Sequence, residues 1–149
     1  MPIVAPGAAA PPVPGLDLED GSRILFFYKV TCPECPMAAP TAERIHEAIP
    51  GRIAGIGQDP PERLEAFERT YGLTLTTTPD LPPYPVSEAY GIRVVPTLVL
   101  VDRGTVADVV ESWDRDGWNR AVKELSERAG DPFRPVSEPA DGLPSFRPG

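Results

Sequence analysis

The spacing of apolar residues divides the chain into stretches with two different periods. Apolar runs rich in β-branched and aromatic residues, bounded by glycine and proline, predict strands. The continuous run Ile24–Tyr28 predicts a buried central strand. The other expected strands are Arg52–Gly57, Leu73–Thr78, Leu98–Val101 and Thr105–Val110, the last two joined by a tight turn at Asp102–Gly104.

Apolar residues that recur every three or four positions predict helices between these strands. The first helix follows Cys35 and contains Pro40, which should kink it. The second is expected to start with Asp59 as its N-cap, with Glu62 completing a capping box, and to end at Gly72.

The last two predicted helices lie on either side of the hairpin. Val86–Tyr90 predicts a short helix that ends at Gly91. Asp114 is the expected N-cap of the final helix. The residues that this helix should turn inward are Trp118, Ala121 or Val122, Leu125 and Ala129.

The order of these elements predicts a single α/β domain. Strand and helix alternate in the first half, which favours parallel strands with right-handed crossovers, and the hairpin adds antiparallel strands. The expected architecture is a mixed central sheet with helices on both faces. A Pro/Ala/Gly-rich N-terminal extension (1–15) precedes the domain (16–130), and a Pro-rich C-terminal tail (131–149) follows it. We expect the tail to lie along the surface, anchored by Phe133 and Phe146.

Composition and charge restrict the classes of function. The chain has 149 residues, 41% of them hydrophobic, which is enough for one core but not for two. Its formal net charge of -8 argues against nucleic-acid and anionic-membrane partners, because both need a basic face. No apolar run reaches the length of about 20 residues that spans a bilayer.

The N-terminal residues and the cysteines bear on the compartment. Met1–Gly15 lacks a basic segment followed by a continuous apolar run, so it does not have the pattern of a signal peptide. We therefore expect a cytoplasmic protein, or a periplasmic one if a signal has been removed. Two closely spaced cysteines are no disulfide framework, and in a reducing compartment such a pair is typical of a catalytic or metal site.

The Cys32-Pro33-Glu34-Cys35 segment lies where the first strand ends and the first helix begins. Backbone N–H groups and the dipole of a helix N-terminus favour a thiolate at Cys32. Cys35 falls one turn inside the helix, where its thiol can attack a mixed disulfide formed at Cys32. These positions make Cys32 the candidate nucleophile and Cys35 the candidate resolving thiol.

Two other interpretations of the cysteine pair remain open. The first is a purely structural or vestigial pair. The second is zinc, but a structural zinc site usually needs four ligands, and His46 is the only other cysteine or histidine in the chain. We therefore predict no metal site.

At these residues the sequence resembles the thioredoxin superfamily, over roughly Leu16–Ala129. The resemblance rests on the strand–CxxC–helix unit, on Pro40 five residues after the second cysteine, and on Val95–Pro96–Thr97 before the hairpin. Within the superfamily the chain is most similar to the redoxin branch, which contains TlpA-like thiol–disulfide oxidoreductases and AhpC/TSA-related peroxiredoxins. The segments that carry this narrower likeness are Gly55–Asp59, Ala89–Ile92 and Leu98–Asp102.

The resemblance implies a thioredoxin-like fold and roles for further residues. It implies a cis peptide bond before Pro96, with this proline against the active-site sulfurs and the Val95 backbone paired with the substrate chain. Pro33 and Glu34, between the cysteines, are further candidates for contact with substrate. No organic cofactor is implied, because a redox-active Cys32–Cys35 disulfide carries the chemistry.

The sequence departs from many thioredoxins at two positions near the motif. Phe26 occupies the place of a buried acid that moves the proton of the second cysteine, and Thr31 replaces the tryptophan before the first cysteine. The candidates for proton transfer by proximity are Tyr28, Lys29 and Glu43. Lys29 close to the thiols would lower the pKa of Cys32, whereas Glu34 would raise it, and a mild net lowering is expected.

The resulting interpretation is a thiol–disulfide oxidoreductase, with two alternatives. A thiol-dependent peroxidase is one, although neither cysteine has the threonine three residues before it that peroxiredoxins use. A non-catalytic interaction module on a thioredoxin scaffold is the other. We expect a monomer that meets protein or small-thiol disulfides and an electron donor such as a thioredoxin-type reductase system.

Overall fold

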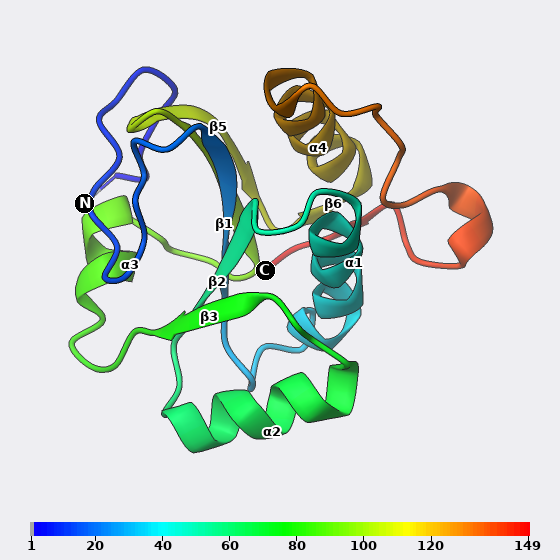
Figure 1. Cartoon of the computed structure of the whole chain (residues 1–149). Coiled ribbons are helices and arrows are strands. Elements are labelled where there is room, and N and C mark those ends of the chain that lie inside the picture. Colours follow the sequence, from blue (N-terminus) through cyan, green and yellow to red (C-terminus); the bar gives the residue numbers. More distant parts are fainter. Residues whose placement is uncertain (1) are drawn as a thin grey trace.

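The computed structural model describes residues 2–149, and Met1 lies outside this range. Its centre is a five-stranded mixed sheet in the order β3-β2-β1-β4-β5 (Figure 1). The strands β1, β2 and β3 are parallel, and β4 and β5 join them as an antiparallel hairpin. The bounds are β1 Ser22–Tyr28, β2 Ile53–Gly57, β3 Thr76–Pro79, β4 Thr97–Asp102 and β5 Thr105–Glu111. The predicted thioredoxin-like α/β fold is therefore confirmed.

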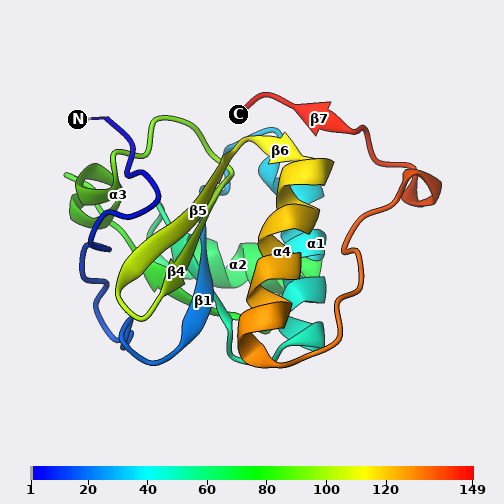
Figure 2. The same cartoon turned by 90° about the horizontal axis from the view of Figure 1, so that it is seen from above.

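The helices cover both faces of this sheet. In both views α1 and α4 lie on one face, and α3 lies on the other beside the N-terminal segment (Figures 1 and 2). The helix α2 packs near the β3 edge. The bounds are α1 Cys35–Ala48, α2 Pro61–Tyr71, α3 Pro85–Tyr90 and α4 Arg115–Ala129, and a one-turn 3-10 helix follows at Pro139–Asp141. Among residues 2–149 no helix is long and apolar enough to cross a membrane.

Strand β1 is buried on both faces, which explains its uninterrupted apolar sequence. Phe26 stacks on Tyr28 and meets Trp118 of α4 edge-on, so these side chains face the α1 and α4 layer. Phe27 faces the other way and contacts Tyr90 of α3. All five aromatic side chains are fully buried, and they fix β1 at the centre of the fold.

The strand register determines which loops meet at the end of the sheet. Phe27 of β1 pairs with Thr97, the first residue of β4, because these two strands are antiparallel. The loop that follows β1 and the loop that precedes β4 therefore emerge at the same end of the sheet. Cys32 follows β1 and Pro96 precedes β4, so this pairing brings the two together.

Two details of the predicted helices are wrong. Helix α2 begins at Pro61 with Pro60 as its N-cap and has no side-chain cap, so Asp59 does not have the expected capping role. Its carboxylate instead accepts a hydrogen bond from the Val30 N–H. Ala129 is exposed rather than inward-facing, as are the two residues before it at the end of α4.

The N-terminal segment lies along the β5 side of the sheet. The Gly7 N–H donates to the Val106 oxygen, the Val106 N–H donates to the Ala8 oxygen, and Ala9 forms a bridge with Thr105. This segment thus continues the sheet beyond β5 by backbone hydrogen bonds.

The C-terminal tail also lies on the surface, but its anchors are not those expected. Phe133 and Phe146 are 36% and 54% exposed, so the expected aromatic anchoring is wrong. Buried Arg115 holds the tail instead, through the Ser137 hydroxyl, the Leu143 oxygen and an ion pair with Asp141. Near its end the tail forms β7 (Phe146–Arg147), which pairs with β6 (Trp113–Asp114).

Candidate active site

The loop between β1 and α1 presents the two cysteines at the start of the helix. The Cys32 N–H donates to the Lys29 oxygen, and the Cys35 N–H donates to the Cys32 oxygen, so tight turns lead from the strand into α1. Both cysteines are free thiols in this structure. Cys32 keeps 4% of its surface exposed, whereas Cys35 is fully buried behind it. Only Cys32 is open to an incoming partner.

Asp59 secures this loop from the neighbouring strand. It follows β2, and its Oδ2 accepts the Val30 N–H at 2.8 Å. Asp59 is buried, with only 8% of the residue exposed. Burial makes a lost partner costly, so Asp59 holds the backbone two residues before Cys32 in place.

The residues Val95 and Pro96 form the opposite side of the site. The Val95–Pro96 peptide bond is cis. The Cys32 thiol donates to the Val95 oxygen, with 3.3 Å between sulfur and oxygen. The structure thus brings together the cysteine motif and the Val95–Pro96 pair, which are more than 60 residues apart in sequence.

The environment shifts the pKa values of the two thiols in opposite directions. A hydrogen bond from the Cys35 thiol, together with the backbone N–H groups of Glu34 and Cys35, lowers the pKa of Cys32 from 9.0 to about 7, against the effect of burial. Glu34 opposes this lowering by its negative charge, and its Oε2 lies 3.9 Å from the Cys32 sulfur. Burial, followed by the bond to Cys32, raises the pKa of Cys35 far above its usual range. Near neutral pH a substantial share of Cys32 is therefore thiolate, while Cys35 keeps its proton.

A groove of about 330 Å³ opens at Cys32. The residues that line it are Lys29, Thr31, Cys32, Pro33, Glu34, Arg93, Val94, Val95 and Gly149. The side chains that carry charge around the sulfur are therefore Lys29, Glu34 and Arg93, although Arg93 is already paired with Glu111. A volume of this size holds a small molecule or one side chain with its flanking backbone.

The three candidates for proton transfer have different surroundings. The Tyr28 hydroxyl lies 3.1 Å from the Thr77 hydroxyl, and burial raises the pKa of Tyr28 to about 12, so it stays neutral. The Glu43 carboxylate accepts hydrogen bonds from the Thr74 N–H and hydroxyl and from the Leu75 N–H. Lys29 lies at the groove, and its backbone lowers the pKa of Cys35.

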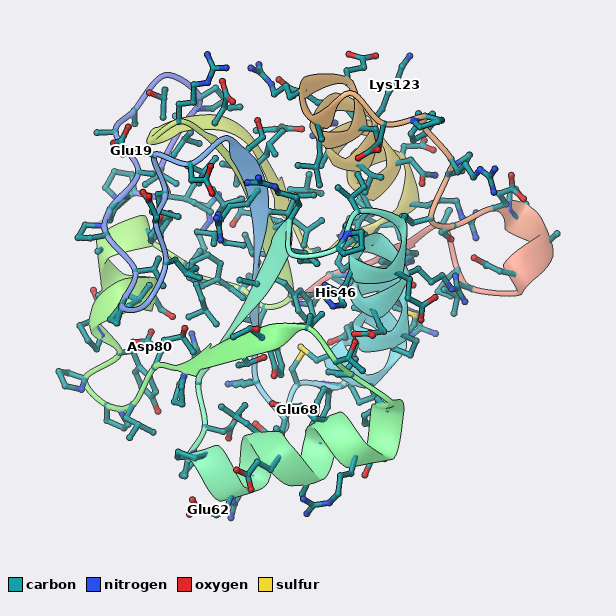
Figure 3. All side chains as sticks on the ribbon, in the orientation of Figure 1. Glu19, His46, Glu62, Glu68, Asp80 and Lys123 are labelled. Atoms are coloured by element: carbon teal, nitrogen blue, oxygen red, sulfur yellow. The ribbon has the colours of Figure 1, made fainter. Side chains whose placement is uncertain are left out.

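No group of three or more metal-type ligands occurs among residues 2–149. His46, the only histidine, lies on α1, where its Nδ1 accepts the Gly51 N–H at 3.4 Å (Figure 3).

Sequence reasoning missed several residues at the groove. Thr31, a departure from the pattern of many thioredoxins, lines the groove beside Cys32. Arg93 precedes the Val95–Pro96 pair closely enough that proximity in sequence could have indicated it. Gly149 carries no sequence signal, because its place depends on the path of the whole tail.

Comparisons with known proteins agree with this geometry. The family model described as AhpC/TSA family matches residues 11–109. No curated protein sequence gives a significant match.

Among solved structures, a secreted Mycobacterium tuberculosis disulfide oxidoreductase homologous to Escherichia coli DsbE has a TM-score of 0.62 and 20% identity, covering 72% of this chain and 84% of its own. Mycobacterium tuberculosis DsbF has a TM-score of 0.63 and 25% identity, covering 72% and 83%. The thioredoxin domain of a Bacteroides vulgatus thiol-disulfide oxidoreductase has a TM-score of 0.68 and 20% identity, covering 82% and 99%. The fold of this chain is that of the thioredoxin-like structures, and with a family match over residues 11–109 the chain belongs to the AhpC/TSA family.

Proposed function

We propose that the protein is a thiol–disulfide oxidoreductase in which Cys32 is the nucleophile and Cys35 the resolving thiol. The observation that carries the proposal is that the two sulfurs differ in pKa and in burial. The pKa of Cys32 is lowered to about 7 at the mouth of a groove, while Cys35 is fully buried and protonated behind it. An attacking thiol works best when its pKa lies near the ambient pH.

The proposed reaction has two exchange steps. The Cys32 thiolate attacks one sulfur of a substrate disulfide, the substrate S–S bond breaks, and the leaving thiolate takes up a proton. Cys35 then loses its proton and attacks the Cys32 sulfur, which releases the second substrate thiol and forms the Cys32–Cys35 disulfide. The substrate gains two electrons and the protein loses two. Every step is reversible, so the same residues serve oxidation or reduction.

The groove supports a role for Val95 in holding the partner of Cys32. Its oxygen lies 3.3 Å from the sulfur, so the atoms bonded to that sulfur in a mixed disulfide lie beside the Val95 backbone. Pro33 and Glu34 form the other wall and are proposed to contact the same partner. The proposed substrates are protein or small-thiol disulfides, with a separate thiol donor to restore the reduced protein and no organic cofactor.

A redox titration tests the proposal directly. The purified protein is equilibrated in glutathione and dithiothreitol buffers, and the state of Cys32 and Cys35 is determined by alkylation and mass. A potential near about −270 mV indicates a thioredoxin-like reductant, and one near about −120 mV indicates an oxidant. If no intramolecular disulfide forms at any poise, the proposal is wrong.

The variant Cys32→Ser separates an exchange enzyme from a binding module. An exchange enzyme loses turnover of every disulfide when its nucleophile is removed. A scaffold keeps its partner, because the hydroxyl is nearly the size of the thiol. Retained turnover in this variant contradicts the assigned mechanism.

A peroxidase is the second candidate, because the matching family model bears the AhpC/TSA description. In that reaction the Cys32 thiolate attacks the peroxide O–O bond, water or an alcohol leaves, and the sulfenic acid at Cys32 condenses with Cys35 to a disulfide and water. Stopped-flow mixing of the reduced protein with peroxide distinguishes the two. Rapid stoichiometric oxidation at Cys32 favours the peroxidase.

We propose the periplasmic alternative for the compartment from one structural neighbour, and the redox titration above also tests it. The Mycobacterium tuberculosis relative is described as secreted, which favours the periplasmic alternative over the cytoplasmic one. An oxidising potential for Cys32–Cys35 suits an extracytoplasmic compartment, and a strongly reducing one suits the cytosol.

A further inference from the structure

The last residues of the tail run beside the active site rather than away from it. The indole Nε1 of Trp113 donates to the Pro144 oxygen at 2.7 Å, and the Arg115 N–H donates to the Ser145 oxygen at 2.9 Å. The pairing of β7 with β6 carries the chain onward to Gly149. In Figure 2 the tail runs past α4 to β7 and the C-terminus, and Gly149 at its end lines the groove at Cys32.

Ser112 fixes the position of Gly149 relative to the Val95–Pro96 pair. Its hydroxyl accepts the Gly149 N–H at 2.8 Å, and its own N–H donates to the Pro96 oxygen at 2.8 Å. Its carbonyl oxygen accepts the indole N–H of Trp118 at 3.2 Å. A single residue therefore ties the tail to the loop that faces Cys32.

Gly149 lies directly against the backbone of that loop. A Cβ at position 149 would lie 2.6 Å from the Val95 oxygen and 3.1 Å from the Val94 Cβ, so only glycine fits there without a shift. The same Val95 oxygen accepts the Cys32 thiol. Within residues 2–149 the Val95 N–H donates no hydrogen bond. The tail thus covers a strip of backbone with which an extended chain would pair beside the nucleophile.

We infer that the segment Phe146–Gly149 is a strap that decides which disulfides reach Cys32. With the strap on the Val94–Val95 backbone, the groove of about 330 Å³ admits low-molecular-weight disulfides. An extended peptide disulfide needs the same backbone and reacts only when the strap has moved. This inference rests on the proposed exchange function and adds the substrate class that the resting structure prefers.

The strap is held weakly enough to move. Phe146 is 54% exposed, the pairing of β7 with β6 is only two residues long, and beyond it Gly149 is held to Ser112 by one hydrogen bond. Removal of that bond should favour the open form about fivefold, which corresponds to about 1 kcal/mol at 25 °C.

The test compares two disulfides with the same leaving group. The full chain carrying Cys35→Ser is used, so that each reaction stops at the Cys32 mixed disulfide. It is mixed with a thiopyridyl disulfide of 2-mercaptoethanol or of a short cysteinyl peptide, and released thiopyridone gives the two rate constants. The ratio of the peptide rate to the small-disulfide rate cancels the intrinsic reactivity of Cys32.

Two variants release the strap by different means. Ser112→Gly removes the hydroxyl that accepts the Gly149 N–H, and glycine suits the positive φ of 71° at this position. Gly149→Val introduces a side chain that cannot remain against the Val95 oxygen. Ala140→Val, an exposed substitution in the tail on the Pro139–Asp141 turn, is the matched control.

If the strap limits access, the ratio of the peptide rate to the small-disulfide rate should rise about fivefold in Ser112→Gly and should also rise in Gly149→Val. The control Ala140→Val should keep the ratio of the parent protein. An unchanged ratio in both variants overturns the inference. A ratio that falls also overturns it, because the tail then helps to bind the peptide. If neither disulfide reacts at Cys32 in the parent protein, the proposed function itself has failed.

Discussion

The groove at Cys32 has two walls that are built in different ways. The first wall belongs to one continuous piece of chain between β1 and α1, with Lys29 to Glu34 at the groove and Cys35 buried behind Cys32. The second is assembled from Arg93–Val95 and Gly149, two distant parts of the chain that Ser112 links through its bonds to Pro96 and Gly149. The first wall contains the reactive sulfurs, and the second controls the space beside them. Chemistry and access therefore depend on separate parts of the sequence and can be altered separately.

The largest expected effect falls on the first wall, where the two cysteines are exchanged for serine one at a time. Cys35→Ser should accumulate a stoichiometric mixed disulfide with a small disulfide, because nothing resolves it. Cys32→Ser should form no adduct, because the remaining Cys35 is fully buried and protonated. Intact-protein mass spectrometry measures both. An adduct on Cys35 at a similar rate contradicts the assignment of roles.

The second wall is tested through Arg115, which anchors the tail from α4. Arg115→Met removes a buried guanidinium that bonds Ser137 and Leu143 and pairs with Asp141. The free energy of unfolding should fall by about 2 kcal/mol, because these are hydrogen bonds to a charged donor in a mostly buried place. Denaturant titration measures this.

The matched control for Arg115 is Lys123→Met on the same helix. Lys123 is exposed on the outer side of α4 (Figure 3), so its substitution should leave the free energy of unfolding nearly unchanged. Equal losses in the two variants would mean that the tail is not held by Arg115.

A smaller effect is expected at Asp59, which supports the first wall from β2. Asp59→Ala leaves the Val30 N–H without its partner and should cost about 1–2 kcal/mol. Asp59→Asn keeps an oxygen acceptor and should lose less. Denaturant titration gives the stabilities, and the alkylation rate of Cys32 reports on the loop. An equal loss in both variants contradicts a role for the carboxylate oxygen as acceptor.

The smallest effect concerns charge within the first wall. The rate of Cys32 alkylation against pH should have its midpoint at about 7, and Glu34→Gln should shift that midpoint lower, because the carboxylate raises the pKa of Cys32. The backbone N–H of residue 34 remains in this variant. A midpoint that rises in Glu34→Gln contradicts this electrostatic role.

The same acidity has a consequence for stability. Because the pKa of Cys32 is depressed in the folded state, the thiolate contributes stability that is fully present above 9.0 and is lost as the pH falls through about 7. As the pH rises from about 7 to 9.0, the free energy of unfolding of the reduced protein should therefore increase. In Cys32→Ser, which has no thiol at this position, the increase should be smaller.

The two walls also differ in how far the sequence predicts them. The strand, the cysteine motif and the helix of the first wall are contiguous, so local periodicity and one spacing indicate them together. Val95 and Pro96 could be joined to this wall only through a resemblance to a known family. That the structure places them beside Cys32 follows from the antiparallel pairing of β1 with β4.

The parts that could not be predicted depend on polar contacts between distant residues. Asp59 resembles a helix cap in sequence, but its partner, Val30, lies 29 positions away. Arg115 and Asn119 hold the tail through carbonyl and hydroxyl groups that have no sequence pattern. Apolar periodicity indicates which positions are buried, but it does not indicate which polar groups pair.

The N-terminal segment that runs beside β5 closes one side of the sheet. Its bonds to Val106 occupy backbone groups that would otherwise be open to a strand from another molecule. The opposite side ends at β3, a strand of four residues that finishes at Pro79, and a short strand with proline is a poor template for further pairing. Both margins of the sheet are therefore poor templates for a strand of another molecule, whereas the Val95 N–H beside Cys32 donates no hydrogen bond within residues 2–149.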